Sequence, residues 1–175
     1  MAQSIRDMLS GGDRRSIGRA DEVADLVRRQ PRKAAGLVEC LWDFDRTVVA
    51  RAANALEKAS REHPSILSPY KDALLGLMVE AEQKELRWQL ALMIPRLQLT
   101  AAECARAAAI LENWLEDSSS IVKTFAMQGL ADLIPQNPSS EAKVLDTLRT
   151  LSRSGTAAMR ARGRILLKRL ERGRR

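Results

Sequence analysis

The chain has 175 residues, of which 45% are hydrophobic but only 3% aromatic, and its 29 Lys and Arg against 22 Asp and Glu give a net charge of +7. This length is sufficient for a sizeable core, which the shortage of aromatic residues restricts to Leu, Ala, Val, Ile and Met. Charged residues interrupt every apolar stretch before the ~18 residues that a membrane span needs, and the N-terminus lacks the apolar segment of a secretory signal. We therefore expect a cytoplasmic protein that does not associate with membranes.

The first predicted elements lie at the N-terminus. Residues 1–12 end in Ser10-Gly11-Gly12, which predicts a short flexible lead-in. Asp13 is a candidate cap for a helix whose apolar face begins at Ile17. Pro31 ends that helix and starts the next, since proline is tolerated at a first helical position. Together these two helices form a first repeat, residues 13–43.

Three further helical hairpins follow in the sequence. The second repeat, residues 44–80, has helices predicted over 45–59 and 65–79, and the third, residues 81–116, over 82–97 and 100–114. Thr100 and Glu103 have the spacing of a capping box, in which each side chain satisfies a free amide at the helix start. The fourth repeat, residues 117–153, has helices predicted over 118–134 and 139–151.

One last helix, over residues 156–171, has no partner and is predicted to cap the preceding repeat, and residues 172–175 form a basic tail. The chain contains no run of alternating β-branched residues, so no strand is predicted. Nine helices joined by short connections, without a linker rich in Pro, Gly or Ser, indicate a single all-α domain over residues 13–171.

A basic residue recurs at a fixed interval along the chain. The intervals are 87 − 51 = 36, 123 − 87 = 36 and 160 − 123 = 37, for Arg51, Arg87, Lys123 and Arg160. An acidic residue stands six positions earlier in two copies, as Asp45 and Asp117, whereas the other two copies have Ala81 and Ser154. Such a period is typical of stacked helical repeats.

This pattern resembles the HEAT-repeat family, whose first helix carries an Asp and an Arg at a similar spacing. The resemblance implies a right-handed α-solenoid of about four helical hairpins with a C-terminal capping helix, although the period here is shorter than the ~40 to 47 residues usual for such units. In that family the acidic and basic residues form a ladder between repeats. The resemblance therefore assigns ladder roles to Asp45, Arg51, Arg87, Asp117, Lys123 and Arg160.

The resemblance also bears on function, because the second helices of HEAT hairpins line the concave face of the solenoid. It places the basic residues Lys71, Arg106, Lys143 and Arg149 among the candidates for partner binding. The leading hypothesis is a non-catalytic scaffold or adaptor that binds another protein on this face. The sequence leaves the partner's identity and the oligomeric state open.

The positive charge is concentrated at the C-terminus. Residues 149–175 contain ten basic residues and one acidic residue, which leaves 7 − 9 = −2 for residues 1–148. Arg160, Arg164, Lys168 and Arg172 form a stripe opposite Met159, Gly163, Leu166 and Leu170. The stripe is interpreted first as the solvated face of a capping helix, and second as a contact for phosphates or an acidic partner. The second interpretation gives the alternative function, nucleic-acid binding, similar to that of HEAT-like alkylpurine DNA glycosylases.

Large apolar residues also recur at this period. Trp42, Met78 and Trp114 are separated by 78 − 42 = 36 and 114 − 78 = 36 residues, near the ends of predicted second helices. The favoured interpretation is that each fills the same core position, and the alternative is a groove lined by the two indoles. Trp88, on a predicted first helix, stands outside this series.

The residues that could carry chemistry are few. His63 is the only histidine, which excludes a histidine-based metal cluster or a His-containing triad within one chain, and Cys40 and Cys104 are expected to be buried hydrophobes. The carboxylates fall before predicted first helices, where capping is favoured over acid–base or metal chemistry. We therefore predict no enzyme activity, no catalytic residue, metal, cofactor or small-molecule substrate.

Overall fold

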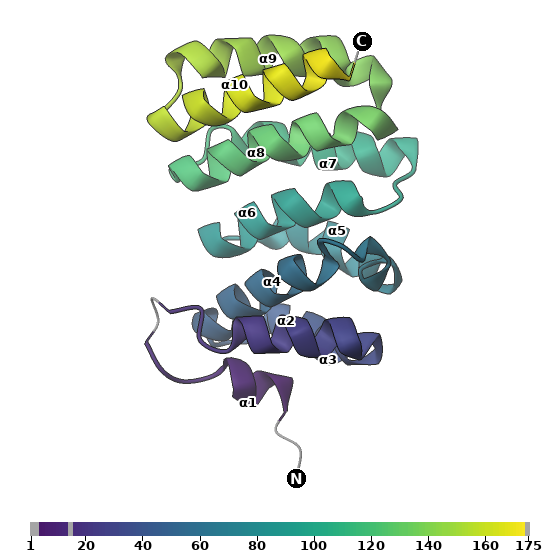
Figure 1. Ribbon diagram of the computed structural model, residues 1–175, viewed down its shortest axis with the longest axis vertical. Helices are drawn as coiled ribbons and strands as arrows, with labels where there is room; N and C mark the ends of the chain where they lie inside the picture. The colour runs from purple at the N-terminus through teal and green to yellow at the C-terminus, as the bar shows by residue number, and fades with distance from the viewer. Residues whose placement is uncertain (1–3, 14–15, 174–175) are drawn as a thin grey trace. The chain divides into compact units, whose positions relative to one another are not determined.

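The computed structural model describes residues 4–13 and 16–173, and throughout these residues the regular structure is helical (Figure 1). Ten α-helices and several short 3-10 turns are formed in this part of the chain, with no strand, which confirms the all-α prediction. Among these helices none is long and apolar enough to cross a membrane. The chain divides into two compact units, Met1–Leu97 and Gln98–Arg175, and each is described by itself.

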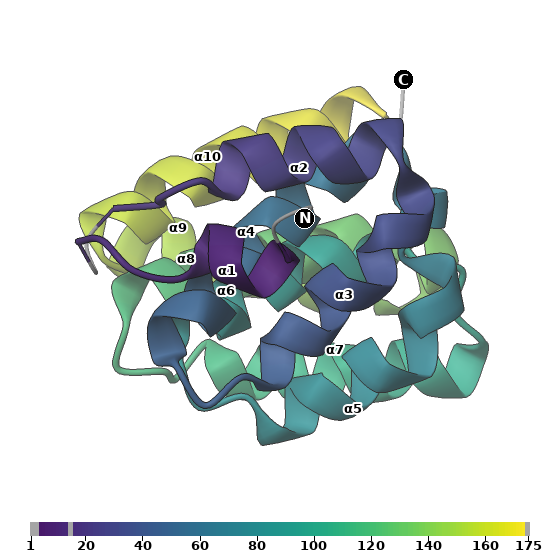
Figure 2. The same cartoon turned by 90° about the horizontal axis from the view of Figure 1, so that it is seen from below.

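Unit 1 is built around one helix, α4. Its helices are α1 (Ile5–Leu9), α2 (Ala20–Arg29), α3 (Ala34–Glu39), α4 (Arg46–Ser60), α5 (Lys71–Glu80) and α6 (Lys84–Met93). α4 lies between α2 and α6, and α1 and α3 also pack against it (Figures 1 and 2). Ten of its fifteen residues are buried, and four of these are alanines, whose small side chains permit such close packing on several sides.

The N-terminal segment differs from the predicted flexible lead-in. Residues Ile5–Leu9 form α1, and the Leu9 side chain is completely buried. Asp13 does not cap the next helix, because α2 begins only at Ala20 and Ile17 is exposed. Gly18 explains the delay, since its φ of +55° is a left-handed conformation that a helix cannot continue through. Residues 1–3 of the lead-in lie outside the described residues.

Prolines shorten several predicted helices of unit 1. Residues Pro64–Ile66 and Ser68–Tyr70 form 3-10 turns, so that α5 begins at Lys71 rather than near residue 65. Another 3-10 turn, Ile94–Arg96, replaces the predicted end of α6. A proline ring removes an amide donor and clashes with the preceding helical turn, which favours short 3-10 segments at these sites.

The helices of unit 2 are α7 (Ala101–Trp114), α8 (Ser120–Leu133), α9 (Glu141–Ser154) and α10 (Ala157–Arg172). In this unit, α8 packs against both α7 and α10, and α10 also packs along α9. The predicted capping box is confirmed at the start of α7: Thr100 accepts a hydrogen bond from the Glu103 amide, and the Glu103 carboxylate accepts one from the Thr100 amide. Residues 174–175 of the predicted basic tail lie outside the described residues.

Gly163 allows α10 to approach its neighbours closely. A Cβ atom at this position would lie 2.9 Å from the Cβ of Ser152 on α9 and 3.3 Å from the Cε of Met127 on α8. The absence of a side chain therefore sets how tightly the last hairpin of unit 2 packs. This contact fixes which face of α10 is buried and which is left to solvent.

Candidate functional site

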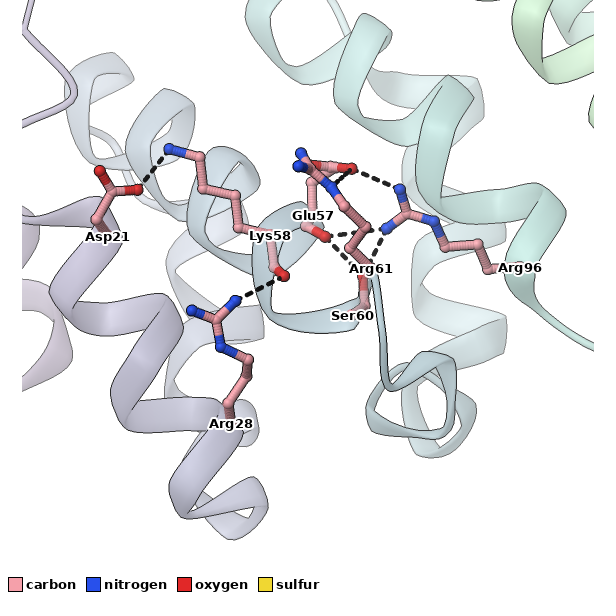
Figure 3. Close-up of polar contacts among 7 residues, drawn as sticks. All are labelled: Asp21, Arg28, Glu57, Lys58, Ser60, Arg61 and Arg96. Atoms are coloured by element: carbon pink, nitrogen blue, oxygen red, sulfur yellow. Dashed lines mark hydrogen bonds and ion pairs between the residues drawn. The ribbon is translucent and has the colours of Figure 1, made fainter.

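A buried carboxylate organises the end of α4 (Figure 3). Glu57 is buried and accepts hydrogen bonds from Arg96 at 2.5 Å and from Arg61 at 2.7 Å. Arg96 also donates to the Glu57 carbonyl at 2.9 Å and to the Ser60 hydroxyl oxygen at 3.1 Å. The network thus ties α4 to the 3-10 turn that follows α6. These four residues form hydrogen bonds with one another, which suits a structural role.

The ionisation of Glu57 follows from this arrangement. Burial alone would raise the pKa of the Glu57 carboxyl, but the hydrogen bonds from Arg61 and Arg96 outweigh burial and hold that pKa below its ordinary value. The carboxylate is therefore charged at neutral pH. A general acid would need a raised pKa, so this group is not suited to proton donation.

Similar polar contacts recur between helices at the repeat interval. In unit 1, Lys58 of α4 pairs with Asp21 of α2 at 2.5 Å, 37 residues away, and Glu57 pairs with Arg96, 39 residues away. In unit 2, Arg169 of α10 pairs with Asp132 of α8 at 2.7 Å, a separation of 169 − 132 = 37. These ion pairs were not predicted from the sequence. Glu57, Lys58 and Asp132 lie toward the C-terminal ends of α4 and α8, whereas Asp21 lies in the first turn of α2. The predicted ladder column lies nearer the starts of the first helices.

Arg51, a predicted ladder member, has a different set of contacts. Its side chain is only 3% exposed, and its guanidinium donates to four backbone carbonyls. These are the carbonyls of Leu9 at 2.8 Å, Gly11 at 2.6 Å, Asp13 at 2.7 Å and Ser16 at 3.1 Å. Within the described residues it makes no ion pair. It therefore anchors the N-terminal segment, and this corrects the expectation that it pairs with an acidic residue.

Four of the five remaining predicted ladder residues contact the backbone close to them in sequence. Asp45 accepts from the Thr47 amide and caps α4, and Asp117 accepts from the Ser119 amide. Arg87 donates to the Ala81 carbonyl at 2.7 Å, and Arg160 to the Gly155 carbonyl at 2.8 Å. Lys123 is half-buried near the start of α8. At these positions the acidic residue satisfies free amides at a helix start, and the arginine satisfies a carbonyl just before it.

Exposed large apolar side chains gather near the turns before α4 and α6. Trp42 is 48% exposed, Phe44 is 89% exposed, and Val79 at the end of α5 is 75% exposed. The prediction that Trp42 fills a core position like Met78 and Trp114 is therefore wrong for Trp42, whereas the other two are buried. The reason is local: Cys40–Trp42 is a 3-10 turn that buries its first two residues and carries the third outward.

We call the side chains of Trp42 and Phe44 the aromatic edge. A groove runs beside them. Its larger part has a volume of about 740 Å³ and is lined by the start of α4 and the start of α6. Phe44 borders this part, Trp42 borders an adjoining hollow, and Glu82 and Gln83 line both. In addition to Asp43, four carboxylates line the two hollows, those of Asp45, Glu80, Glu82 and Glu85. Two cations, Arg46 and Lys84, line them as well. The groove therefore has a net negative lining.

Arg6 of α1 holds the aromatic edge in place. Its guanidinium binds both oxygens of Asp43, at 2.6 and 3.2 Å, and its Cζ lies 5.0 Å from the centre of the Phe44 ring. The hydrogen bond from Arg6, followed by that from the Asp45 amide, lowers the pKa of Asp43 below its ordinary value. The short segment between α3 and α4 is thus fixed from the side of α1.

This lowered pKa predicts a pH dependence. Because the pKa of Asp43 is lower in the folded than in the unfolded chain, its contribution to stability is present above the unfolded pKa and is lost as the pH falls through the folded pKa. We expect Asp43→Asn to lower the free energy of unfolding at pH 6, and this difference to shrink below pH ~4, the ordinary range of Asp. Urea unfolding of both proteins between pH 6 and 2.5 measures it. A difference that is independent of pH would contradict the assignment.

The candidates on the predicted second helices are found in both units. Lys71 begins α5 in unit 1 and is half-buried, and Arg106 of α7 is exposed. Lys143 of α9 is exposed and pairs with Glu112 of α7 at 2.6 Å, and Arg149 is exposed on α9. The structure brings Lys143 and Glu112 together across the two second helices of unit 2. No exposed aromatic residue accompanies them in residues 98–173.

The predicted basic stripe lies on the outer side of α10. Arg160, Arg164, Lys168 and Arg172 are all exposed, whereas Met159, Gly163 and Leu166 are buried against the rest of unit 2. Two other arginines of the same helix are bound: Arg162 donates to Gln128 and lies 5.3 Å from the Phe125 ring centre, and Arg169 pairs with Asp132. α10 therefore has one side of bound arginines and one of solvent-facing cations.

Chemistry-bearing groups do not converge elsewhere in residues 4–13 and 16–173. No group of three or more His, Cys, Asp or Glu that could hold a metal ion is found there. Cys40 and Cys104 are both buried as predicted, and burial raises the pKa of each thiol. Thiols with raised pKa values are poor nucleophiles at neutral pH.

Comparison with known proteins gives no match, whether to protein-family models, to curated proteins or to solved structures. The candidate sites are therefore described from the structure alone. Two of them are distinct in chemistry and belong to different units. They are the aromatic edge with its acidic groove in unit 1 and the basic stripe of α10 in unit 2.

Proposed function

We propose that the chain is a HEAT-like α-solenoid that acts as a non-catalytic adaptor for another protein. The recurrence of inter-helix polar contacts supports the repeat: Asp21 with Lys58, Glu57 with Arg96, Ser120 with Thr156 and Asp132 with Arg169 are separated by 36 to 39 residues. In stacked hairpins each repeat contacts only its neighbours, so contacts separated by about one repeat are expected. Repeat stacks of this kind present extended surfaces, which suit adaptors rather than enzymes.

The observation that carries the binding function is the exposure of the aromatic edge. Trp42 and Phe44 leave large apolar surfaces in water beside a groove. Tryptophan is among the residues that contribute most to binding energy at protein interfaces, and aromatic residues are enriched there. An exposed apolar cluster rimmed by charged residues is typical of an interaction site. We therefore place partner binding at the aromatic edge in addition to the second helices.

The charges of the groove define the chemistry of the partner. Asp45, Glu80, Glu82 and Glu85 outnumber Arg46 and Lys84 around it. A partner segment with apolar side chains for Trp42 and Phe44, and with lysine or arginine residues between them, is complementary to this lining. Such a partner would associate faster at low ionic strength, since the attraction is screened by salt.

Site-specific photo-crosslinking tests this proposal. A benzophenone amino acid placed at position 44, where the side chain is exposed, is expected to form a discrete adduct with one protein in extracts of the source cells. The same probe at Ile165, an exposed residue of unit 2, serves as the matched control. Trp42→Ser in the chain that carries the probe at position 44 is expected to reduce the yield of the adduct by at least tenfold, because it removes an interface tryptophan worth ~2 kcal/mol or more.

The outcome separates specific binding from adhesion by an exposed aromatic residue. An adduct that is specific to position 44, sensitive to Trp42→Ser, and reproduced with the purified partner would support the adaptor function. Identical adducts from positions 44 and 165, or a yield that does not depend on Trp42, would contradict it. Circular dichroism of each variant reports whether the helical content is unchanged.

A further inference from the structure

The cations of α10 divide into two groups with different environments. Arg162 and Arg169 are directed toward α8, where they bind Gln128 and Asp132. Arg164, Lys168 and Arg172 are exposed and make no ion pair within the described residues. Arg160 is exposed as well, and one nitrogen of its guanidinium donates to the Gly155 carbonyl. The side of α10 away from α8 therefore carries four cations along its length.

The spacing of these cations forms a continuous basic surface. Residues four apart in an α-helix are about 6 Å apart along its axis and about 40° apart around it, so the four side chains follow one slowly turning stripe. The exposed neighbours of the stripe are Ala157 and Ala158 before it, and Ala161 and Ile165 within it. The alanine side chains are too small to cover the cations. Arg149 and Arg153 are also exposed on α9, the helix packed along α10. Only Glu171 adds an acidic charge to α10.

The surrounding residues restrict what can bind this stripe. A helix that lies on a membrane inserts an apolar face, but Met159 and Leu166 of α10 are buried in unit 2, and Ile165 is the one large exposed hydrophobic residue of this helix. A single isoleucine does not make an apolar face. Proteins that bind single-stranded nucleic acids combine a basic groove with aromatic side chains on which the bases stack. The only aromatic residues in 98–175 are Trp114, which is buried, and Phe125, which is covered by Arg162. What remains is a row of guanidinium and ammonium groups suited to regularly spaced phosphates.

We propose that the outer side of α10 is a binding surface for the phosphate backbone of a double-stranded nucleic acid. The proposed contact is electrostatic and independent of base sequence, because contacts of cations with phosphates carry no sequence information directly. Arg160, Arg164, Lys168 and Arg172 supply the four central phosphate contacts. This surface belongs to unit 2 and is independent of the aromatic edge of unit 1.

A fluorescence-anisotropy titration with a labelled 20-base-pair DNA duplex of mixed sequence tests the proposal. Four phosphate contacts predict a slope of about −3.6 in a plot of log K against log salt concentration. Arg164→Glu with Lys168→Glu is expected to reduce the affinity at low salt by at least tenfold and to make the slope shallower. The matched control is Arg29→Glu with Arg32→Glu, which changes the net charge by the same amount at exposed positions of unit 1. We expect the control to retain affinity within about threefold of the unaltered chain, since its cations make no phosphate contact.

Three results would overturn the proposal. The first is no binding of the duplex at low salt. The second is an equal loss of affinity in the stripe variant and the control, since the net charge rather than the stripe would then be responsible. The third is a preference for another anion, seen as tighter binding of the single strand, of poly-glutamate, or of vesicles containing phosphatidylserine. Circular dichroism confirms that both variants keep their helical content.

Discussion

Replacement of Glu57 by alanine is expected to lower the free energy of unfolding by about 3 kcal/mol, at the lower end of the cost of removing one partner from a buried ion pair. Glu57 is buried and binds Arg96, most of which is also removed from water. Without the carboxylate, the Arg96 guanidinium keeps only the Glu57 carbonyl and the Ser60 hydroxyl as acceptors. The charge is then left partly buried without an anion, which is the main source of the cost.

Two variants control this measurement. Arg61→Ala should cost less than about 1 kcal/mol, because the Arg61 side chain is 61% exposed and such pairs are screened by water. The double variant Glu57→Met with Arg96→Met should recover part of the loss, since replacing both members of a buried ion pair by apolar residues is often tolerated. Urea unfolding followed by circular dichroism gives the free energies. Equal effects of Glu57→Ala and Arg61→Ala would show that Arg96 is not the important partner.

The second large effect is expected for Arg51→Met, which should release the N-terminal segment without unfolding α4. Four carbonyls, those of Leu9, Gly11, Asp13 and Ser16, would lose their donor, and they can regain hydrogen bonds only by moving into water. Release of the segment would expose Leu9, at a cost of ~2 kcal/mol for the apolar side chain. We expect hydrogen exchange in residues 4–13 to accelerate by at least tenfold, whereas α4 and α6 keep their protection.

Arg51→Lys is the matched control for this variant. Lysine retains the charge but presents a single ammonium group, which cannot span four carbonyls as the planar guanidinium does. An intermediate acceleration of exchange is therefore expected, measured by mass spectrometry of the peptide that contains α1. If the lysine variant behaves as the unaltered chain, the charge of Arg51 matters and its hydrogen-bond geometry does not. If Arg51→Met leaves exchange unchanged, the anchoring role is wrong.

The helix signals in the sequence predicted most of the helices, although not α1 or the late start of α2. Asp45 and the Thr100/Glu103 box marked helix starts correctly, because capping depends on residues within one turn of each other. The all-α class and the burial of Met78 and Trp114 followed from apolar periodicity in the same way. The basic stripe of α10 was also predicted from the sequence, because residues spaced four apart on a helix lie on one face whatever the rest of the chain does.

Contacts between distant segments were decided only by the tertiary structure. Nothing near Arg51 in the sequence identifies the carbonyls it binds, which are 35 to 42 residues away, and a column of basic residues suggested acidic partners instead. No local pattern in the sequence indicates that Glu57 and Arg96 are brought together and buried by packing. The aromatic edge depended on a 3-10 turn at Cys40–Trp42, which rotates Trp42 out of the core although its spacing matches that of two buried residues. Local patterns thus determined where helices form and which face is polar, whereas burial and long-range hydrogen bonding, which depend on every neighbouring helix, determined the candidate surfaces.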